Sequence, residues 1–317
     1  MKHDQQRRRL SSGISWLAFW LAATGACSLN KLAMNKVAGM LSAPSGNNVF
    51  TQDNDPELVG DALPFAIKLY ESLLASVPEH EGLRLRTGSL YIMYANAFLQ
   101  TPADMMPRQQ LDQKEFMLGR SKNLYLRGRD ILLVGLEKKN PALLQQLKDR
   151  KYTQALAVFT KKDVPTLYWA AAGWVGAFGI DPFDMKLGVM LPQAAAIMER
   201  VSKLDPGFSG GAVHNFYILY YGSLPDYMGG DVKKAREHFQ LAMEASGGRD
   251  SSPLISLATT VETKEQNAEG FRSLLQKVLD IDPDADPDNR LVNTLNRRKA
   301  RWLLDHQDDY FLLEDEQ

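Results

Sequence analysis

The stretch AAAIMERVSKLDP at residues 194–206 decides the fold class of this chain. Ala194, Met198 and Val201 are spaced four and three residues apart, so they lie on one face of an α-helix. The helix has to end at Asp205-Pro206, because the residue before a proline is driven out of the α region. The stretch therefore predicts an amphipathic helix whose small and apolar face packs against a neighbouring helix.

The same spacing recurs along the chain at irregular intervals. The further sets are Ala66, Tyr70, Leu73 and Pro78; Arg129, Leu133, Leu136 and Pro141; Ala235, Phe239 and Ala242, with Gly247 in place of the proline; and Phe271, Leu275, Val278 and Pro283. This spacing resembles the second helix of a tetratricopeptide hairpin, and Gly88, Tyr91, Trp169 and Gly173 fit its first helix. A regular array would repeat about every 34 residues, whereas these sets are farther apart. We therefore predict an all-α fold of degenerate tetratricopeptide-like helical hairpins stacked into a compact superhelix, with extra helices or loops at 100–114 and 142–165.

The first 26 residues have the layout of a signal peptide. Basic residues at positions 2 and 7–9 precede an uncharged run from Leu10 to Ala26, which ends at Cys27, the single cysteine of the chain. Small residues before this cysteine predict cleavage by a lipoprotein signal peptidase and lipid attachment to the Cys27 thiol. Thr24 stands where a bacterial lipobox usually has leucine, so an uncleaved single-helix anchor and ordinary secretory cleavage after Ala26 stay open. All three alternatives place the remaining chain outside the cytoplasm, and we expect a periplasmic, membrane-anchored lipoprotein.

Three segments follow from these patterns: a signal peptide at 1–26, a lipid-anchored tether with a short docking helix at 27–56, and a tetratricopeptide-like helical domain at 57–317. The docking helix is predicted from Leu32, Val37, Met40 and Leu41. The whole chain has 37 basic and 38 acidic residues, so it lacks the basic excess of a nucleic-acid-binding protein. Because the one cysteine is committed to the anchor, we expect buried apolar area rather than a disulfide to stabilise the folded domain.

The residue types that carry catalysis or metal binding form no recognisable site in the sequence. His80-Glu81 lacks a second histidine at helical spacing. The alternating aspartates of 280–288 resemble calcium ligands, but the glycine and the final glutamate of a calcium loop are missing, so capping and turn chemistry explain them better. The glycines at 173, 176 and 179 follow no strand, so close helix packing explains them better than a dinucleotide loop, and no serine lies in a nucleophile-elbow context. We expect no catalytic residue, cofactor or metal.

Aromatic residues are concentrated at 168–178 and again at 216–227. Most of them are expected to fill the cores of the hairpins, since tyrosine and tryptophan are bulky helical packing residues. The alternative is a concave groove that presents aromatic anchors to a partner segment. Under that hypothesis the candidate groove residues are Tyr217, Tyr220, Tyr221 and Tyr227.

Several stretches spread over the chain carry a family resemblance. They are DPELV at 55–59 with ALPF at 62–65, YANAF at 94–98, LYLRGR at 124–129, YWAAAGW at 168–174, SLP at 223–225 with GGD at 229–231, and PDNRL at 287–291 with RRKARWLL at 297–304. As a set they resemble the T component of TRAP transporters, the TatT family of bacterial envelope lipoproteins. The resemblance implies a tetratricopeptide-like protein that binds the periplasmic substrate-binding subunit of a tripartite ATP-independent transporter. It also implies self-association as a trimer.

Three functions are compatible with these observations. The first is an interaction scaffold that self-associates and binds the substrate-binding protein of a TRAP-type solute importer. The second is a tetratricopeptide lipoprotein that acts as an adaptor in outer-membrane or cell-wall assembly. The third is a periplasmic enzyme with a helical fold, which would require a cluster of ionisable side chains that the sequence does not announce. We expect the first function.

Overall fold

The computed structural model describes residues 36, 38–40 and 49–312. Cys27, the predicted signal peptide and most of the predicted tether lie outside this part of the chain. Of the positions that predict the docking helix, only Met40 is described, and it is helical and exposed. Its neighbour Ala38 is fully buried in a small cluster with Leu74, Val77 and Leu83. The entering chain therefore packs against the main body at this point.

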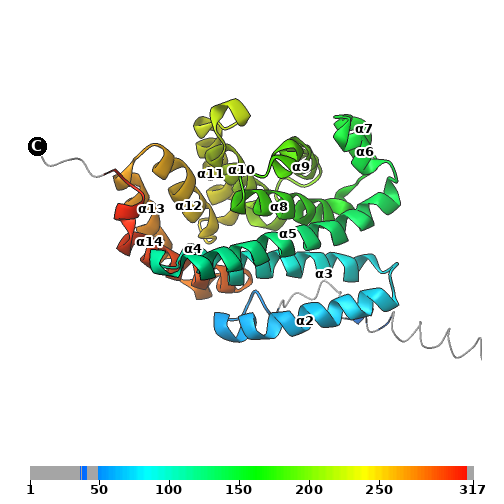
Figure 1. Cartoon of the computed structure of the whole chain (residues 1–317), viewed down its shortest axis with the longest axis horizontal. Helices are drawn as coiled ribbons and strands as arrows, with labels where there is room; N and C mark the ends of the chain where they lie inside the picture. Colours follow the sequence, from blue (N-terminus) through cyan, green and yellow to red (C-terminus); the bar gives the residue numbers. More distant parts are fainter. Residues whose placement is uncertain (1–35, 37, 41–48, 313–317) are drawn as a thin grey trace, which may run out of the picture.

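Helices and connecting turns make up the described residues, and no strand occurs among them. The α-helices are α2 (Pro56–Ser76), α3 (Glu81–Tyr94), α4 (Thr101–Asp104), α5 (Leu111–Lys139), α6 (Leu143–Lys148), α7 (Tyr152–Leu156), α8 (Val164–Ile180), α9 (Met185–Leu204), α10 (Ala212–Ser223), α11 (Val232–Ser246), α12 (Ser252–Leu257), α13 (Ala268–Asp280) and α14 (Arg290–Asp305). Two π-helices, η1 (Ala95–Gln100) and η6 (Ala258–Glu262), continue α3 and α12. Short 3₁₀ helices are η2 (Arg108–Gln110), η3 (Lys161–Asp163), η4 (Phe208–Gly211), η5 (Asp226–Met228), η7 (Pro283–Ala285), η8 (Pro287–Asn289) and η9 (Gln307–Asp309). The predicted all-α class is confirmed (Figure 1).

The five spacing sets lie on α2, α5, α9, α11 and α13, as expected. Asn140 and Asp205, each followed by proline, are the C-caps of α5 and α9, because a pre-proline residue cannot continue the helix. Ala194, Met198 and Val201 of the deciding stretch are fully buried. The predicted insertions are also present: 100–114 includes α4 and η2, and 142–165 includes α6, α7 and η3.

The main core is built where α5 and α8 lie between α3 and α9 (Figure 1). α3 and α5 approach so closely that a Cβ added at Gly128 would lie 2.6 Å from the carbonyl oxygen of Gly88. α8 brings Trp174 into this core, where the indole is almost fully buried and the Arg129 guanidinium lies 5.1 Å from its ring centroid. A second core joins α10 to α14 around Phe271. Small residues at the crossings therefore set how tightly the central layer packs.

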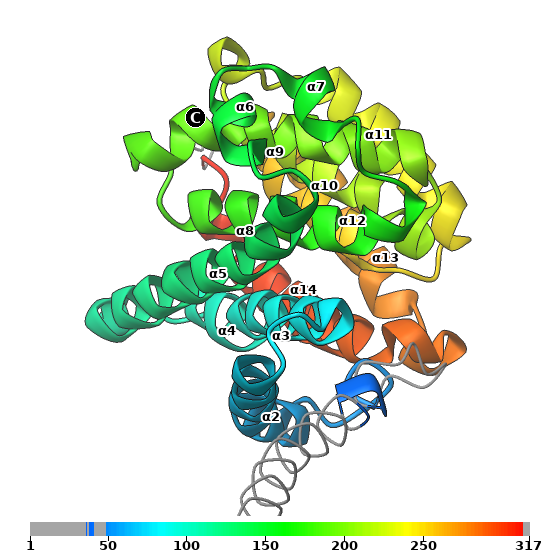
Figure 2. The ribbon, with the colours of Figure 1, turned by 90° about the vertical axis from the view of Figure 1, so that its right-hand side faces the viewer.

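The last helix packs back against the first ones, so the array closes on itself (Figure 2). Leu291 of α14 shares a cluster with Val59, Leu63 and Tyr91 of α2 and α3. Its backbone N–H donates to the carbonyl oxygen of Thr51 at 2.9 Å. Further polar links across the closure are Arg298 with Glu57, Arg290 with the Gln52 carbonyl, Lys299 with Asp104 and Arg108 with Asp309.

Candidate functional site

The predicted groove region lies on the α10–α11 hairpin. Tyr217 and Tyr221 are one turn apart on α10, so both face α11, where the His238 ring stacks on them. The centroid of His238 lies 4.6 Å from that of Tyr217 and 5.8 Å from that of Tyr221. His214, one turn before Tyr217, completes the group, because its Nδ1 lies 3.0 Å from Nδ1 of His238. Stacked rings and one hydrogen bond therefore join the two helices.

The structure brings three of the four candidate tyrosines together. Tyr217 and Tyr221 stack at 5.7 Å, and Tyr220 meets Tyr221 edge to face at 5.4 Å. Tyr217 is only 8% exposed and belongs to the main core, which agrees with the packing interpretation for this residue. Tyr220 and Tyr221 are half-buried against the same core. Tyr227 makes no ring contact with them among the described residues and is 88% exposed.

The turn that carries Tyr227 is fixed by several contacts. Asp226 forms an ion pair with Lys264 at 2.9 Å, and the Asp231 N–H donates to the Tyr221 carbonyl oxygen at 3.0 Å. Gly230 is required here, because a Cβ at this position would lie 1.9 Å from the carbonyl oxygen of Leu224. The exposed ring of Tyr227 is therefore presented by an ordered turn rather than by a loose loop.

The histidine pair was not foreseen from the sequence, because its members lie on different helices. Burial, followed by the nearby His214 and the Lys234 ammonium, lowers the pKa of His238 to about 4. Burial also lowers the pKa of His214. Both rings are therefore neutral at pH 7, and the Nδ1–H of one ring donates a hydrogen bond to the unprotonated Nδ1 of the other.

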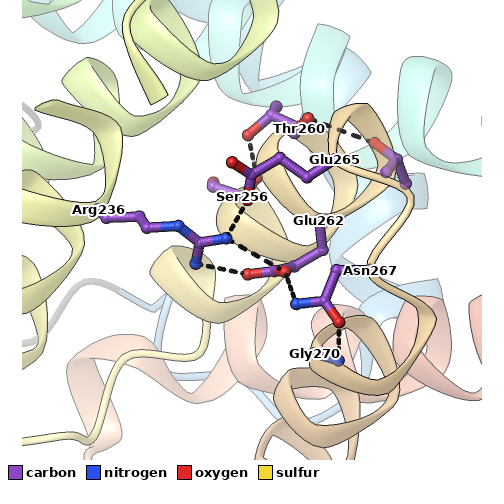
Figure 3. A network of polar contacts seen from close by, with 8 residues as sticks. Arg236, Ser256, Thr260, Glu262, Glu265, Asn267 and Gly270 are labelled. Carbon is purple, nitrogen blue, oxygen red and sulfur yellow. Dashed lines mark hydrogen bonds and ion pairs between the residues drawn. The ribbon is translucent and has the colours of Figure 1, made fainter. Parts of the chain in front are cut away.

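A charged network joins α11 to η6 and α13 (Figure 3). The Arg236 guanidinium donates to both carboxylate oxygens of Glu262, at 2.8 and 3.3 Å, and also to Glu265. Asn267 donates to Glu262 at 2.6 Å and accepts from the Gly270 N–H at 3.0 Å, which caps α13. These hydrogen bonds raise the pKa of Arg236, the largest contribution coming from Glu262. Glu262 is 2% exposed, so the network holds a buried carboxylate in a fully bonded state.

An open hollow of about 600 Å³ lies beside this network. Its lining residues are Val232, Lys233, Arg236, Glu237, Gln240 and Glu265. Two basic and two acidic side chains face it, so it offers no excess charge to an ionic ligand. Among the described residues no group of three or more histidine, cysteine, aspartate or glutamate side chains is placed to bind a metal ion.

Large apolar side chains are also exposed at the turn between α8 and α9. Phe183 in this turn is 92% exposed, and Met185 and Val189 follow it on one face of α9. These residues could not be predicted from the sequence, because single apolar side chains in a turn give no periodic signal. Phe183 and Tyr227 are the most exposed large apolar side chains among the described residues.

The family is decided by comparison with known proteins. The sequence model described as "TRAP transporter T-component" matches residues 52–311 of the chain. The chain belongs to the TRAP transporter T-component family. The resemblance noted from the sequence stretches is thereby confirmed, and the match covers every α-helix described from α2 to α14.

A relative of this T component is an uncharacterized protein from Treponema pallidum (strain Nichols). It is 34% identical over 301 residues, which cover 90% of this chain and 93% of the relative. The family description names part of a transporter, which fits a non-catalytic role. In the part of the chain described by the structure, no helix has the length and hydropathy needed to cross a membrane.

Proposed function

We propose that this protein is a periplasmic lipoprotein scaffold that is anchored through Cys27 and binds the substrate-binding subunit of a TRAP-type solute importer. The observation that carries the proposal is the family match over residues 52–311, whose description places the family with TRAP transporters. The all-helical body supports it, since stacked helical hairpins offer extended surfaces for protein partners.

The partner surface in this proposal includes Tyr227 together with the exposed edges of Tyr220 and Tyr221. Exposed aromatic and methionine side chains are typical anchors of protein interfaces. Phe183 and Met185 form a second candidate contact at the α8–α9 turn. Tyr217 contributes to this surface indirectly, because its buried ring stacks against the ring of Tyr221.

The experiment measures binding between the purified protein and the TRAP substrate-binding protein of the same organism. Tyr227→Ala and Phe183→Ala are compared with Val134→Ala, an exposed apolar residue on α5 that serves as the matched control. An interface anchor should weaken binding by roughly tenfold or more when truncated, whereas the control should change it little. If no substrate-binding protein is bound and barrel-assembly or cell-wall enzymes are captured instead, the adaptor role in envelope assembly replaces this proposal.

Self-association is the second element of the proposal, and the outer face of α2 is our candidate for it. Leu58, Phe65 and Leu69 follow helical spacing along this face and are exposed, Phe65 by 75%. A continuous apolar stripe on a surface helix is typical of an interface. We propose that copies of the chain meet here, as a trimer.

Sedimentation analysis of the wild type and of Phe65→Glu tests this assignment. A charge in the stripe should shift the protein toward monomer, whereas Phe116→Glu on α5, also an exposed phenylalanine, should leave the assembly unchanged. A wild-type protein that sediments as a monomer at all concentrations contradicts self-association.

A further inference from the structure

One segment of the chain departs strongly from its overall charge balance. Residues 138–162 contain a single acidic residue, Asp149, although acidic and basic residues are almost equal over the whole chain. The basic residues of the segment are Lys138, Lys139, Lys148, Arg150, Lys151, Lys161 and Lys162. This set forms what we term the basic end.

Some of these charges are neutralised locally. Lys138 pairs with Glu79 at 2.7 Å, Lys139 with Asp163 at 2.5 Å and Lys161 with Asp205 at 3.2 Å. Lys151 lies 3.6 Å from Asp149. Lys148, Arg150 and Lys162 are exposed and have no ion pair among the described residues. Exposed pairs in water are weak and exchange readily, so Lys151 and Lys161 stay accessible to another anionic group.

The fold of the α6–α7 insertion directs these side chains outward. Its apolar residues Leu143, Leu147 and Phe159 are fully buried, which leaves the polar positions between them on the surface. Every basic side chain from Lys148 to Lys151 is exposed. The charge therefore lies on the outside of the insertion and not in an internal network.

Arg150 occupies a position that normally belongs to glycine. Its φ is 59°, in the left-handed region, and it follows the C-terminus of α6. The Arg150 N–H donates to Leu147 at 3.1 Å and the Lys151 N–H donates to Gln146 at 2.8 Å, which is the Schellman pattern of a helix end. Glycine would adopt this conformation without steric cost. A strained, exposed arginine at such a position points to a role for its charge.

One member of the basic end, Lys138, lies at the turn against which the N-terminal chain packs. Lys138 also donates to the carbonyl oxygen of Pro78, in the turn between α2 and α3. Ala38 packs against Val77 and Leu83 on either side of the same turn. α6, α7 and the α2–α3 turn lie at the right-hand end of the molecule in Figure 1 and face the viewer in Figure 2. Cys27 and Lys36 are nine residues apart in the sequence, a separation of at most about 30 Å even in a fully extended chain.

We propose that the basic end lies against the anionic phospholipid headgroups of the membrane that holds the anchor. The inference rests on the anchoring in the proposed function, because a short tether brings this end, rather than another, close to the lipid. Clusters of lysine and arginine next to a membrane anchor bind anionic lipid surfaces. Only Asp163 separates Lys162 from the start of α8, and α8 ends before Phe183. Its 17 residues therefore hold the α8–α9 turn about 25 Å from the lysine pair. The apolar turn with Phe183 then points away from the membrane.

The test uses the full chain reconstituted in vesicles of phosphatidylcholine alone or of phosphatidylcholine with phosphatidylglycerol. Acetylation rates of individual lysines are read by mass spectrometry. Lys148 and Lys162 should be acetylated several-fold more slowly in the anionic vesicles, and high salt should abolish the difference. Lys186 and Lys233, which are exposed elsewhere on the body, serve as internal controls and should react equally in both.

A triple variant, Lys148→Gln with Arg150→Gln and Lys162→Gln, sharpens the test. It should remove the lipid-dependent protection of Lys151 and Lys161, whereas the matched triple Lys186→Gln, Lys233→Gln and Lys277→Gln should keep it. Equal acetylation in both kinds of vesicle, or failure of the chain to stay with the vesicles, overturns the proposal. Protection of these lysines that requires an added protein rather than anionic lipid also overturns the proposal.

Capture of the substrate-binding protein is measured in the same vesicles as a separate readout. Loss of capture with lysine protection retained rejects the import role and keeps the membrane contact. Capture of the substrate-binding protein without lysine protection rejects the membrane contact and keeps the import role.

Discussion

Two helix pairs of this protein are joined by different kinds of contact. α3 and α5 cross at Gly88 and Gly128, where backbone almost touches backbone. α10 and α11 are joined by stacked rings and a hydrogen bond between His214 and His238, and Arg236 ties α11 to Glu262. The first contact depends on the absence of side-chain volume, and the second depends on charge and proton state. The two regions should therefore fail under different perturbations.

The largest effect is expected from added volume at the glycine crossing. Gly128→Ala places a methyl group 2.6 Å from a backbone oxygen, so the helices must separate, at a cost of about 2–3 kcal/mol. Gly119→Ala on the same helix meets nothing within 4 Å and should stabilise the protein by up to about 1 kcal/mol through helix propensity. Urea unfolding of both variants measures the contrast. Equal stability of the two would show that the crossing is not tightly packed.

A somewhat smaller loss is expected from removing the charge that faces Glu262. Arg236→Leu leaves a buried carboxylate with Asn267 as its remaining donor, and because Arg236 is itself partly exposed we expect a loss of about 2 kcal/mol. Arg236→Leu with Glu262→Gln should recover part of that loss, since the unpaired charge is gone. Glu265→Gln, on the exposed side of the same guanidinium, is the control and should cost little. No recovery in the double variant would show that packing rather than charge explains the loss.

The third effect is a dependence of stability on pH, which we expect from the α10–α11 pair and not from the α3–α5 crossing. The folded pKa of His238 is about 4, below the value of about 6.5 for an unfolded histidine, so the unfolded chain binds more protons between these values. The contribution of the neutral His238 ring to the free energy of unfolding is fully present above pH 6.5 and is lost as the pH falls toward 4. Urea midpoints at pH 7.5 and pH 5 should therefore differ more for the wild type than for His238→Phe. A pH dependence of His238→Phe equal to that of the wild type would show that this ring does not carry the effect.

The smallest effect on stability is expected at Tyr227. Its ring is almost fully exposed, so Tyr227→Ala should change the free energy of unfolding by less than about 0.5 kcal/mol. Thermal unfolding of this variant therefore checks that any loss of partner binding comes from the surface. A large fall in the melting temperature would mean that the turn at 223–231 supports the hairpin.

The helices could be predicted from the sequence because the signals that define them are local. Asn140-Pro141 and Asp205-Pro206 end helices by backbone sterics, which need no knowledge of the fold. Contacts between helices were harder to predict, because Gly88 and Gly128 show no spacing relation that predicts their contact. The π-helices were not foreseen either, since no residue pattern announces a change of hydrogen-bond register.

The candidate groove shows the limit of spacing arguments at a site. Tyr217, Tyr220 and Tyr221 follow the helical spacing of a buried face, and the same spacing would fit a face that lines a groove. Tyr217 is buried because it packs against the main core. This contact could be predicted only from the positions of the other helices. Tyr227 is exposed because it lies in the turn beyond α10, and its role in binding stays a prediction.

The return of α14 to α2 has a consequence for how the protein unfolds. In an open array of hairpins the two outermost units each have one neighbour, so they fray first and independently. Here the segment before α2 is hydrogen-bonded to the start of α14 through Thr51 and Leu291, so neither outermost unit has a free side. Loss of the last helix should therefore loosen the first one, and the body should melt in a single cooperative step.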